Sequence, residues 1–545
     1  MSHATTTHFD AVIVGAGFAG LYQLHRLRGL GMTARVIEAG SGVGGTWFWN
    51  RYPGARCDVE SMQYSYAFSN ELQQDWKWSE MFSSQPEILA YANHVADRLD
   101  LRRDIDFNTR VTAAKFNETT NQWSVSTSHG AELTARFVIM ATGCLSTARE
   151  PAFPGRDSYK GKTYHTGAWP HEGVDFTGMR VGVIGTGSSA IQAIPVIAEQ
   201  AAHLTVFQRT PNYSIPSRNK PMTEDYERQW KDDYESLRVK ARGTRNGILA
   251  NPNDYSALSL SEAERLRVYE QRWASGGTTF MASFNDLIFS QAANDTAAEF
   301  VRGKIRLIVK DPATAELLAP KDHPIGTKRI CVDTRYYETY NRPNVTLVDV
   351  RAAPIAAITE TGLRTANASY DFDAIVFATG FDAMTGALTA IDIHSTDGAT
   401  LKAKWEDGPR TYLGLMCAHF PNMFMITGPG SPSVLSNMHV SIEQDVDWIT
   451  DCLSYLHENK ITRMEAAQES EDNWVLHGIE VANTTLYPKA ASWYMGANIE
   501  GKPRVFMPYI GGVAAYKEKC ADVAAAGYTG FRLSGAAAGV ARAAE

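Results

Sequence analysis

Two glycine-rich turns, each between an apolar strand and a helix, constrain the fold of this chain more than any other feature. The first turn, Gly15–Gly20, follows the β-branched stretch Phe9–Val14 and precedes leucines at helical spacing. The second, Gly185–Ala190, follows Arg180–Ile184, 170 positions further on. A strand, a glycine turn and a helix in this order form a dinucleotide-binding unit. The sequence therefore predicts an α/β protein with two Rossmann-like dinucleotide-binding domains.

In the first turn, each glycine has its own physical reason. Gly15 permits the tight turn, Gly17 lets the backbone approach a pyrophosphate, and Gly20 lets the helix pack on the strand. The next predicted strand, Ala34–Ile37, leads to Glu38. A carboxylate there accepts hydrogen bonds from ribose hydroxyls and repels a 2′-phosphate. This site is therefore expected to hold FAD or NAD.

The second unit differs at the matching position. Its second strand, Leu204–Phe207, leads through Gln208 to Arg209. A guanidinium suits a 2′-phosphate, which favours NADPH over NADH, although a surface arginine of no consequence stays possible. Two dinucleotides on one chain predict hydride transfer from a nicotinamide to a flavin, so the first site is assigned to FAD.

Two further apolar strands, Phe137–Met140 and Ala374–Phe377, both run into Ala-Thr-Gly. Such strand ends are typical of the points where flavoprotein chains cross between domains. The alternative is that any buried parallel strand can end on a glycine turn.

The region from about residue 222 to 305 has long amphipathic stretches, with capping-box patterns at Ser261/Glu264 and Thr296/Glu299. It predicts a helical insertion that covers a site. The whole chain is then divided into an FAD-binding domain (1–150 and 383–534), an NADP-binding domain (151–221 and 326–382), a helical insertion (222–325) and a disordered tail (535–545).

Charge and cysteine usage exclude several classes of protein. The net charge of −8, with no basic block, argues against nucleic-acid binding. No apolar run approaches the roughly 18 residues that a membrane span needs. The six cysteines form no Cys-x-x-Cys pair or zinc-ligand spacing, which excludes a disulfide reductase and predicts no metal site. A cytoplasmic location is expected, and no protein partner is evident.

Two motifs identify a family. Gly44–Asp58 is rich in glycine, aromatic and charged residues, and Tyr159–Pro170 has the pattern Y-x-G-x₃-H-x₃-W-P. Both resemble the signatures of type I Baeyer–Villiger monooxygenases, with Tyr159 in place of the usual phenylalanine. Gly428–Asn437 resembles the longer active-site loop of the phenylacetone and steroid monooxygenase branch. The resemblance covers most of the chain.

The resemblance implies a role for individual residues. Arg329 matches the active-site arginine over the flavin, and Asp58 the carboxylate that pairs with it. His165 and Trp169 are placed at a domain junction, where we favour a structural hinge over a proton carrier. The remaining assignments are to FAD (Gly15, Gly17, Gly20, Glu38, Thr46, Trp47, Asp58, Tyr64, Val111, Met438), to NADP (Gly185, Thr186, Gly187, Ser188, Ser189, Ala190, Gln192, Arg209, Thr210, Lys328), to a mobile loop over the nicotinamide (Trp493), and to the substrate pocket (Ser433, Val434, Leu435, Met438).

The chemistry implied by this resemblance uses NADPH, O₂ and a ketone. NADPH reduces FAD, oxygen adds at C4a, and the peroxyflavin attacks the carbonyl to give a tetrahedral (Criegee) intermediate and then an ester or lactone. An anionic oxidant needs a fixed cation in a site without water, and Arg329 cannot deprotonate. Two alternatives would need no Arg329–Asp58 pair: a flavin N- or S-hydroxylating monooxygenase and a non-catalytic NADPH-sensing flavoprotein.

Overall fold

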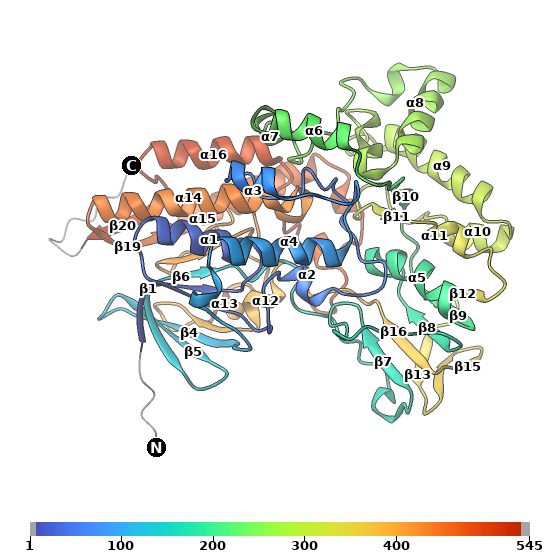
Figure 1. Ribbon diagram of the computed structural model, residues 1–545, viewed down its shortest axis with the longest axis horizontal. Coiled ribbons are helices and arrows are strands. Elements are labelled where there is room, and N and C mark those ends of the chain that lie inside the picture. Colours follow the sequence, from blue (N-terminus) through green and yellow to red (C-terminus); the bar gives the residue numbers. More distant parts are fainter. Residues whose placement is uncertain (1–6, 536–545) are drawn as a thin grey trace.

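The computed structural model describes residues 7–535 and places the two glycine turns in two separate sheets (Figure 1). The first is an eight-stranded sheet of order β17-β4-β5-β6-β1-β2-β3, with β18 paired to β6. Its strands are β1 (Thr7–Val14), β2 (Ala34–Ile37), β3 (Ile105–Asp106), β4 (Val111–Asn117), β5 (Gln122–Thr127), β6 (Glu132–Met140), β17 (Asp392–His394) and β18 (Met423–Met425).

The second sheet has five strands in the order β12-β9-β8-β16-β7, and every pairing in it is parallel. Its strands are β7 (Lys162–His165), β8 (Arg180–Ile184), β9 (His203–Gln208), β12 (Val345–Asp349) and β16 (Ala374–Phe377). The strands β8, β9 and β16 are largely buried and apolar, as is typical of parallel sheets that helices cover on both faces, and the sequence predicted these three. The strands β7 and β12 are more exposed and were not predicted.

Small sheets complete the strand inventory: β10 (Ser214–Pro216) with β11 (Cys331–Asp333), β13 (Ile355–Ile358) with β14 (Gly362–Thr365) and β15 (Ser369–Asp371), and β19 (Ile461–Ala466) with β20 (Phe531–Gly535). The tail was predicted to begin at Gly535, and that boundary is wrong because Gly535 still pairs with β19. Residues 536–545 lie outside the described residues.

The first turn shows why its glycines are required. Gly15 has a φ of +105°, and a Cβ there would lie 2.6 Å from the carbonyl oxygen of Ala141. A Cβ on Gly20 would lie 1.9 Å from the carbonyl oxygen of Gly15, so only glycine lets α1 (Phe18–Gly29) start this close to the strand. The same constraint recurs at Gly185, where a Cβ would lie 2.4 Å from the carbonyl oxygen of Ala378.

Long helices cover the first sheet. α1, α4 (Gln85–Arg98), α14 (Met438–Glu458) and α16 (Val513–Ala525) share one apolar core with it. α5 (Ser188–Gln200) begins at the second turn and packs in the core of the second sheet. The other helices outside the insertion are α2 (Thr46–Trp49), α3 (Asn70–Asp75), α11 (Tyr336–Thr339), α12 (Gly386–Thr389), α13 (Leu401–Lys404) and α15 (Gln468–Asn483).

The chain crosses between the two sheets twice. It leaves the first sheet after β6 and next pairs in the second sheet at β7, and it returns from β16 to β17. Both departures follow an Ala-Thr-Gly, so the expectation that these triplets mark crossings is confirmed.

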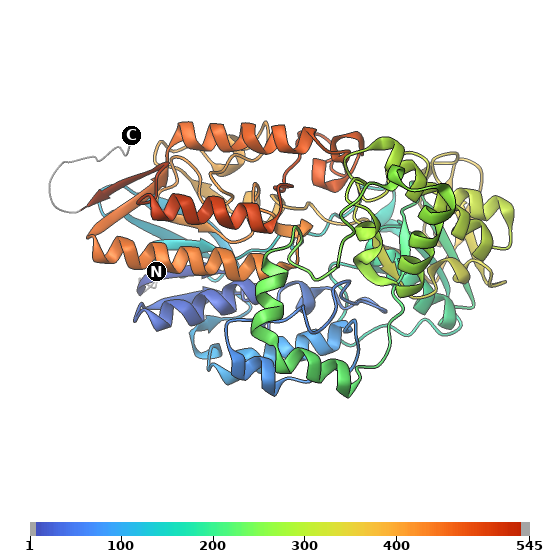
Figure 2. The same cartoon turned by 90° about the horizontal axis from the view of Figure 1, so that it is seen from above.

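The helical insertion touches both halves of the molecule. It contains α6 (Glu224–Asp232), α7 (Tyr234–Arg242), α8 (Glu262–Ser275), α9 (Gln291–Ile308) and α10 (Pro312–Leu318). Trp230 and Tyr234 join the core of the first sheet, whereas Tyr269 and Phe300 join that of the second. In Figure 2, α6 and α7 accordingly lie beside the helices of the first sheet, and α8 to α10 lie on the side of the second sheet.

One capping box was predicted correctly and one was not. Ser261 and Glu264 form both reciprocal bonds at the start of α8. Thr296 lies inside α9, which begins after Ser290, and its hydroxyl donates to the carbonyl of Ala293. The pattern failed there because a threonine can bond to a carbonyl of the preceding turn within a helix. No helix in residues 7–535 is long and apolar enough to cross a bilayer.

Arg238 of α7 should be a main anchor of the insertion. Its side chain is 5% exposed and donates to the carbonyl of Gln63 at 2.7 Å and to the hydroxyl of Ser65 at 2.7 Å. We expect Arg238→Ala to lower the free energy of unfolding by about 2–4 kcal/mol, because buried acceptors lose a charged donor. Urea denaturation measures this loss. Arg228→Ala on exposed α6 is the control and should change stability by less than about 0.5 kcal/mol.

Candidate active site between the two glycine turns

A single cavity of about 1410 Å³ connects the two turns. Gly15 and Gly17 line one part of it, and Gly185 and Gly187 line another. Both helices that follow begin without a side-chain cap on their first N–H groups. Free N–H groups at a helix start favour an anion such as a pyrophosphate. The cavity is therefore built to hold two dinucleotides within reach of each other.

The first turn fits an FAD pyrophosphate and ribose. A Cβ on Gly45 would lie 2.9 Å from the Cα of Gly17, so two backbone segments form a narrow cradle. Glu38 follows β2 and lines the cavity, and its carboxylate accepts N–H bonds from Ala16 and Gly40, both at 2.6 Å. The carboxylate thus fixes the turn and keeps further lone pairs for ribose hydroxyls.

Cations surround the second turn. Arg209 and Lys328 both line the cavity. Burial lowers the pKa of Lys328; Asp322 opposes this effect, and the nearby charges of Arg209 and Arg351 add to it. A cluster in which cations disfavour one another fits a 2′-phosphate, whose charge would relieve the repulsion.

Arg351 was missed by the sequence analysis. Its guanidinium donates to the hydroxyl of Thr210 at 3.3 Å and to Asp322 at 2.9 Å. A signal was available, because Arg351 follows β12, which pairs in parallel with β9, the strand that precedes Arg209. Carboxyl ends of parallel strands meet at one edge of a sheet.

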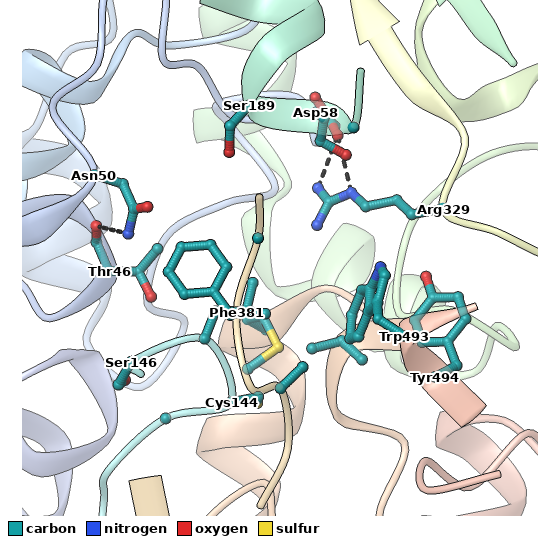
Figure 3. Close-up of a pocket in the computed structure, with 18 of the residues that line it drawn as sticks. Thr46, Asn50, Asp58, Cys144, Ser146, Ser189, Arg329, Phe381, Trp493 and Tyr494 are labelled. Carbon is teal, nitrogen blue, oxygen red and sulfur yellow. Dashed lines mark hydrogen bonds and ion pairs between the residues drawn. The ribbon is translucent and has the colours of Figure 1, made fainter. Parts of the chain in front are cut away.

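Arg329 and Asp58 meet on the cavity wall although 271 positions separate them (Figure 3). The Nη2 and Nε atoms of Arg329 donate to one oxygen of Asp58, at 2.7 and 3.2 Å. The Asp58 side chain is 6% exposed, whereas that of Arg329 is 38% exposed because it opens onto the cavity. The ionised Asp58 raises the pKa of Arg329 more than burial lowers it. The cavity therefore contains a permanent, oriented cation.

Comparison with known proteins shows which families this chain resembles. Residues 12–286 match the family described as pyridine nucleotide-disulphide oxidoreductase. A Baeyer–Villiger monooxygenase of Pseudooceanicola batsensis is 44% identical over 96% of this chain and 95% of its own. A phenazine N-monooxygenase of Lysobacter antibioticus is 42% identical over 97% of each chain. The solved structure of an oxidized steroid monooxygenase bound to NADP is 54% identical, with a TM-score of 0.93 over 97% of this chain and 100% of that one.

The chain belongs to the Baeyer–Villiger monooxygenases. The match to pyridine nucleotide-disulphide oxidoreductases, which covers half of the chain, places it in that wider family as well. All six cysteines lie within the described residues and are buried and unpaired, so this monooxygenase carries no redox disulfide there.

Gln192 of α5 docks the Baeyer–Villiger motif loop onto the second unit. Its amide donates to the carbonyl of Arg56 at 3.0 Å and to Asp58 at 3.4 Å, and it accepts from the hydroxyl of Tyr52 at 2.9 Å. A Cβ on Gly54 would lie 2.3 Å from the backbone oxygen of Gln192. Close approach therefore explains this glycine in the loop that presents Asp58.

Most other predicted residues of this monooxygenase line the same cavity. Trp47 and Tyr64 are joined by a hydrogen bond of 3.1 Å on the FAD side. Lining residues from the expected sets also include Thr46, Val111, Met438, Val434, Leu435, Thr186, Ser188, Ser189, Thr210 and Trp493. Gly20 and Ala190 are buried behind their turns and outside this lining.

Ser433 is not where it was expected. Its side chain is fully buried, bonds to the backbone oxygen of Thr427 at 3.1 Å and lies 3.0 Å from the sulfur of Cys144. It is therefore not part of the cavity lining, unlike Val434 and Leu435 next to it. A short 3₁₀ turn, Ser433–Leu435, directs successive side chains to different sides.

His165 and Trp169 also lie outside the cavity lining. The Nδ1 atom of His165 accepts from the N–H of Gly167, so Nε2 carries the proton and donates to the carbonyl of Arg149 at 3.1 Å. Burial lowers the pKa of His165, which keeps the ring neutral. Arg149 follows the first crossing and Thr379, 3.2 Å from the same nitrogen, lies in the second. This position favours a hinge over a proton carrier.

The acceptor role of Glu38 can be tested by replacing one oxygen. Glu38→Gln turns an acceptor into a donor that faces a backbone N–H, so we expect the Kd for FAD to rise about 10- to 100-fold. Flavin content after dialysis and titration with FAD measure it. Glu71→Gln, on a side chain that is 82% exposed, is the control. Unchanged flavin retention in Glu38→Gln would contradict the assignment.

The charge cluster predicts cofactor preference. Arg209→Ala should raise the KM for NADPH about 10- to 100-fold, because a charge-assisted phosphate contact is lost, with little change for NADH. Steady-state kinetics with both cofactors measure the two values. Arg180→Ala, whose exposed partner is Asp373, serves as the matched control. Equal losses for both cofactors would exclude a phosphate contact.

Proposed function

We propose that this chain is an FAD-containing monooxygenase that uses NADPH and O₂ to convert ketones to esters or lactones. The observation that carries the proposal is the Arg329–Asp58 pair on the wall of a cavity shared by both dinucleotide sites. When bound, FAD accepts a hydride from NADPH and, once reduced, activates O₂ for attack on a carbonyl carbon.

The residues of the chain supply binding and electrostatics. The first turn and Glu38 hold FAD, while Arg209 and Lys328 hold the 2′-phosphate of NADPH. Arg329 places a permanent positive charge beside the ketone oxygen, which becomes negative as its carbon is attacked. Asp58 fixes the plane of the guanidinium, so no reorganisation is needed when that charge develops.

Each domain has its own part in the proposed function. We propose an FAD domain formed by 1–150 and 383–534, an NADP domain formed by 151–221 and 326–382, and an insertion, 222–325, that closes the cavity. Residues of the insertion, Ile248 and Met281 among them, line the cavity and support this role. The buried, unpaired cysteines support a cytoplasmic location.

Oxidation of an aromatic nitrogen is a second candidate, because one relative is named a phenazine N-monooxygenase. An aromatic nitrogen acts as the nucleophile and has no carbonyl oxygen that becomes negative during the reaction, so the Arg329 cation would matter less. Incubation of the enzyme with phenylacetone and with phenazine, followed by product analysis, separates the two activities.

Arg329→Ala should affect the two halves of the reaction differently. We expect NADPH still to reduce the flavin, whereas ester formation falls by at least about 10²- to 10³-fold, because one oxyanion partner is lost. The oxygen consumed should then appear as hydrogen peroxide. Stopped-flow absorbance measures reduction, and gas chromatography measures the ester from phenylacetone.

Asp58→Asn is the matched variant, because it keeps the shape of the side chain and removes only the charge. It should lower ester formation less than Arg329→Ala does, since the cation remains but is held less firmly. Near wild-type ester formation by Arg329→Ala would refute the proposed mechanism.

A further inference from the structure

We propose that Tyr494 is a further catalytic residue, whose phenol donates a hydrogen bond to the ketone oxygen beside Arg329. The inference rests on the proposed ketone oxidation and adds a second donor to it. The phenol keeps its proton throughout, so no bond is formed or broken at Tyr494.

Tyr494 belongs to the short 3₁₀ turn Trp493–Met495 and lines the cavity. Its side chain is almost fully buried, with 3% exposed. Figure 3 shows its hydroxyl directed toward Arg329, with Trp493 beside it. The residue therefore lies at the part of the cavity where the fixed cation is.

The ring of Tyr494 is held firmly. It packs on Trp493 with centroids 4.2 Å apart, and on Tyr487 and Phe506 at 5.8 and 6.2 Å. The N–H of Met507 donates to its backbone oxygen at 2.9 Å. Aromatic packing of this kind fixes the direction of the hydroxyl before a ligand binds.

The hydroxyl of Tyr494, which lines the cavity, has no hydrogen-bond partner among residues 7–535, in contrast to the hydroxyls of two other buried tyrosines, Tyr22 and Tyr516. The hydroxyls of Tyr22 and Tyr516 donate to Asp447 and to the carbonyl of Leu413, both at 2.6 Å. The hydroxyl oxygen is not sealed in the interior but opens onto the cavity, so a ligand oxygen in the cavity can accept its hydrogen bond.

The charge states of the Tyr494 phenol and the Arg329 guanidinium leave both groups able to donate a hydrogen bond. Burial raises the pKa of Tyr494 more than Arg329 lowers it, so the phenol is a donor at neutral pH. Arg329 uses Nε and Nη2 for Asp58, and its Nη1 meets no acceptor within the described part of the chain. Both groups thus present a free donor, an N–H and an O–H, to the same cavity, and the proposal places one ligand oxygen between them, as in an oxyanion hole.

Tyr494→Phe removes only the hydroxyl and tests the proposal. We expect flavin reduction by NADPH to stay within about twofold of wild type, whereas ester formed per NADPH falls about tenfold and hydrogen peroxide rises. Tyr494→His keeps an N–H donor and should restore part of the coupling. Tyr487→Phe removes the same atom from a neighbouring ring whose charged neighbour is Arg245, and should have the smaller effect.

Equilibrium binding gives a readout that does not depend on turnover. Phenylacetate, an oxyanion probe, is titrated into the oxidised holoenzyme and followed by the change in flavin absorbance. Tyr494→Phe should weaken its binding about tenfold and leave propylbenzene, which has no oxygen, unchanged. Equal phenylacetate affinity and equal coupling in the two enzymes would overturn the proposal.

The outcomes separate this inference from the proposed function. A wild-type enzyme that forms no ester from any ketone tested refutes the proposed function. A wild-type enzyme that forms ester, with a Tyr494→Phe variant that equals it, refutes only the role of Tyr494. Loss of FAD or of flavin reduction in Tyr494→Phe would also refute that role, because it would show that the hydroxyl is structural.

Discussion

The ion pair between Arg329 and Asp58 is the interaction on which the shape of the site depends. Asp58 is presented by a loop of the first unit, and Arg329 comes from the second unit just after the helical insertion. A charge in this location is strongly unfavourable without its partner. The two units must therefore dock in an arrangement that brings the pair together, and Gln192 reinforces that arrangement by bonding to Asp58 and its loop.

The two similar folds carry opposite charges at the matching strand end, and we propose that this difference sets the dinucleotide that each one binds. Glu38 uses its carboxylate to hold the turn, and its negative charge would repel a phosphate. Arg209, Lys328 and Arg351 instead concentrate positive charge, with Asp322 offsetting part of it. A bound phosphate would relieve the repulsion within this cluster, so electrostatics could set cofactor choice with little change in backbone.

The sequence predicted accurately those elements whose signal lies in adjacent residues. The strands at 34–37, 180–184 and 374–377 have the predicted bounds, because buried parallel strands are short apolar runs with clear ends. It failed at Thr296, where the same residue pattern occurs within a helix and at its start. The helix begins earlier, at Gln291, because Ser290 caps it by accepting from the N–H of Ala293.

The sequence by itself determined the two glycine turns and the charged residue after each following strand, because these features lie within one βαβ unit. Family motifs added the pairing of Asp58 with Arg329 but no geometry. The tertiary structure alone decided that Ser433 faces inward, that Arg351 joins the phosphate cluster and that the Tyr494 hydroxyl faces Arg329. These facts depend on which side chains meet when distant segments pack, and no local spacing encodes that.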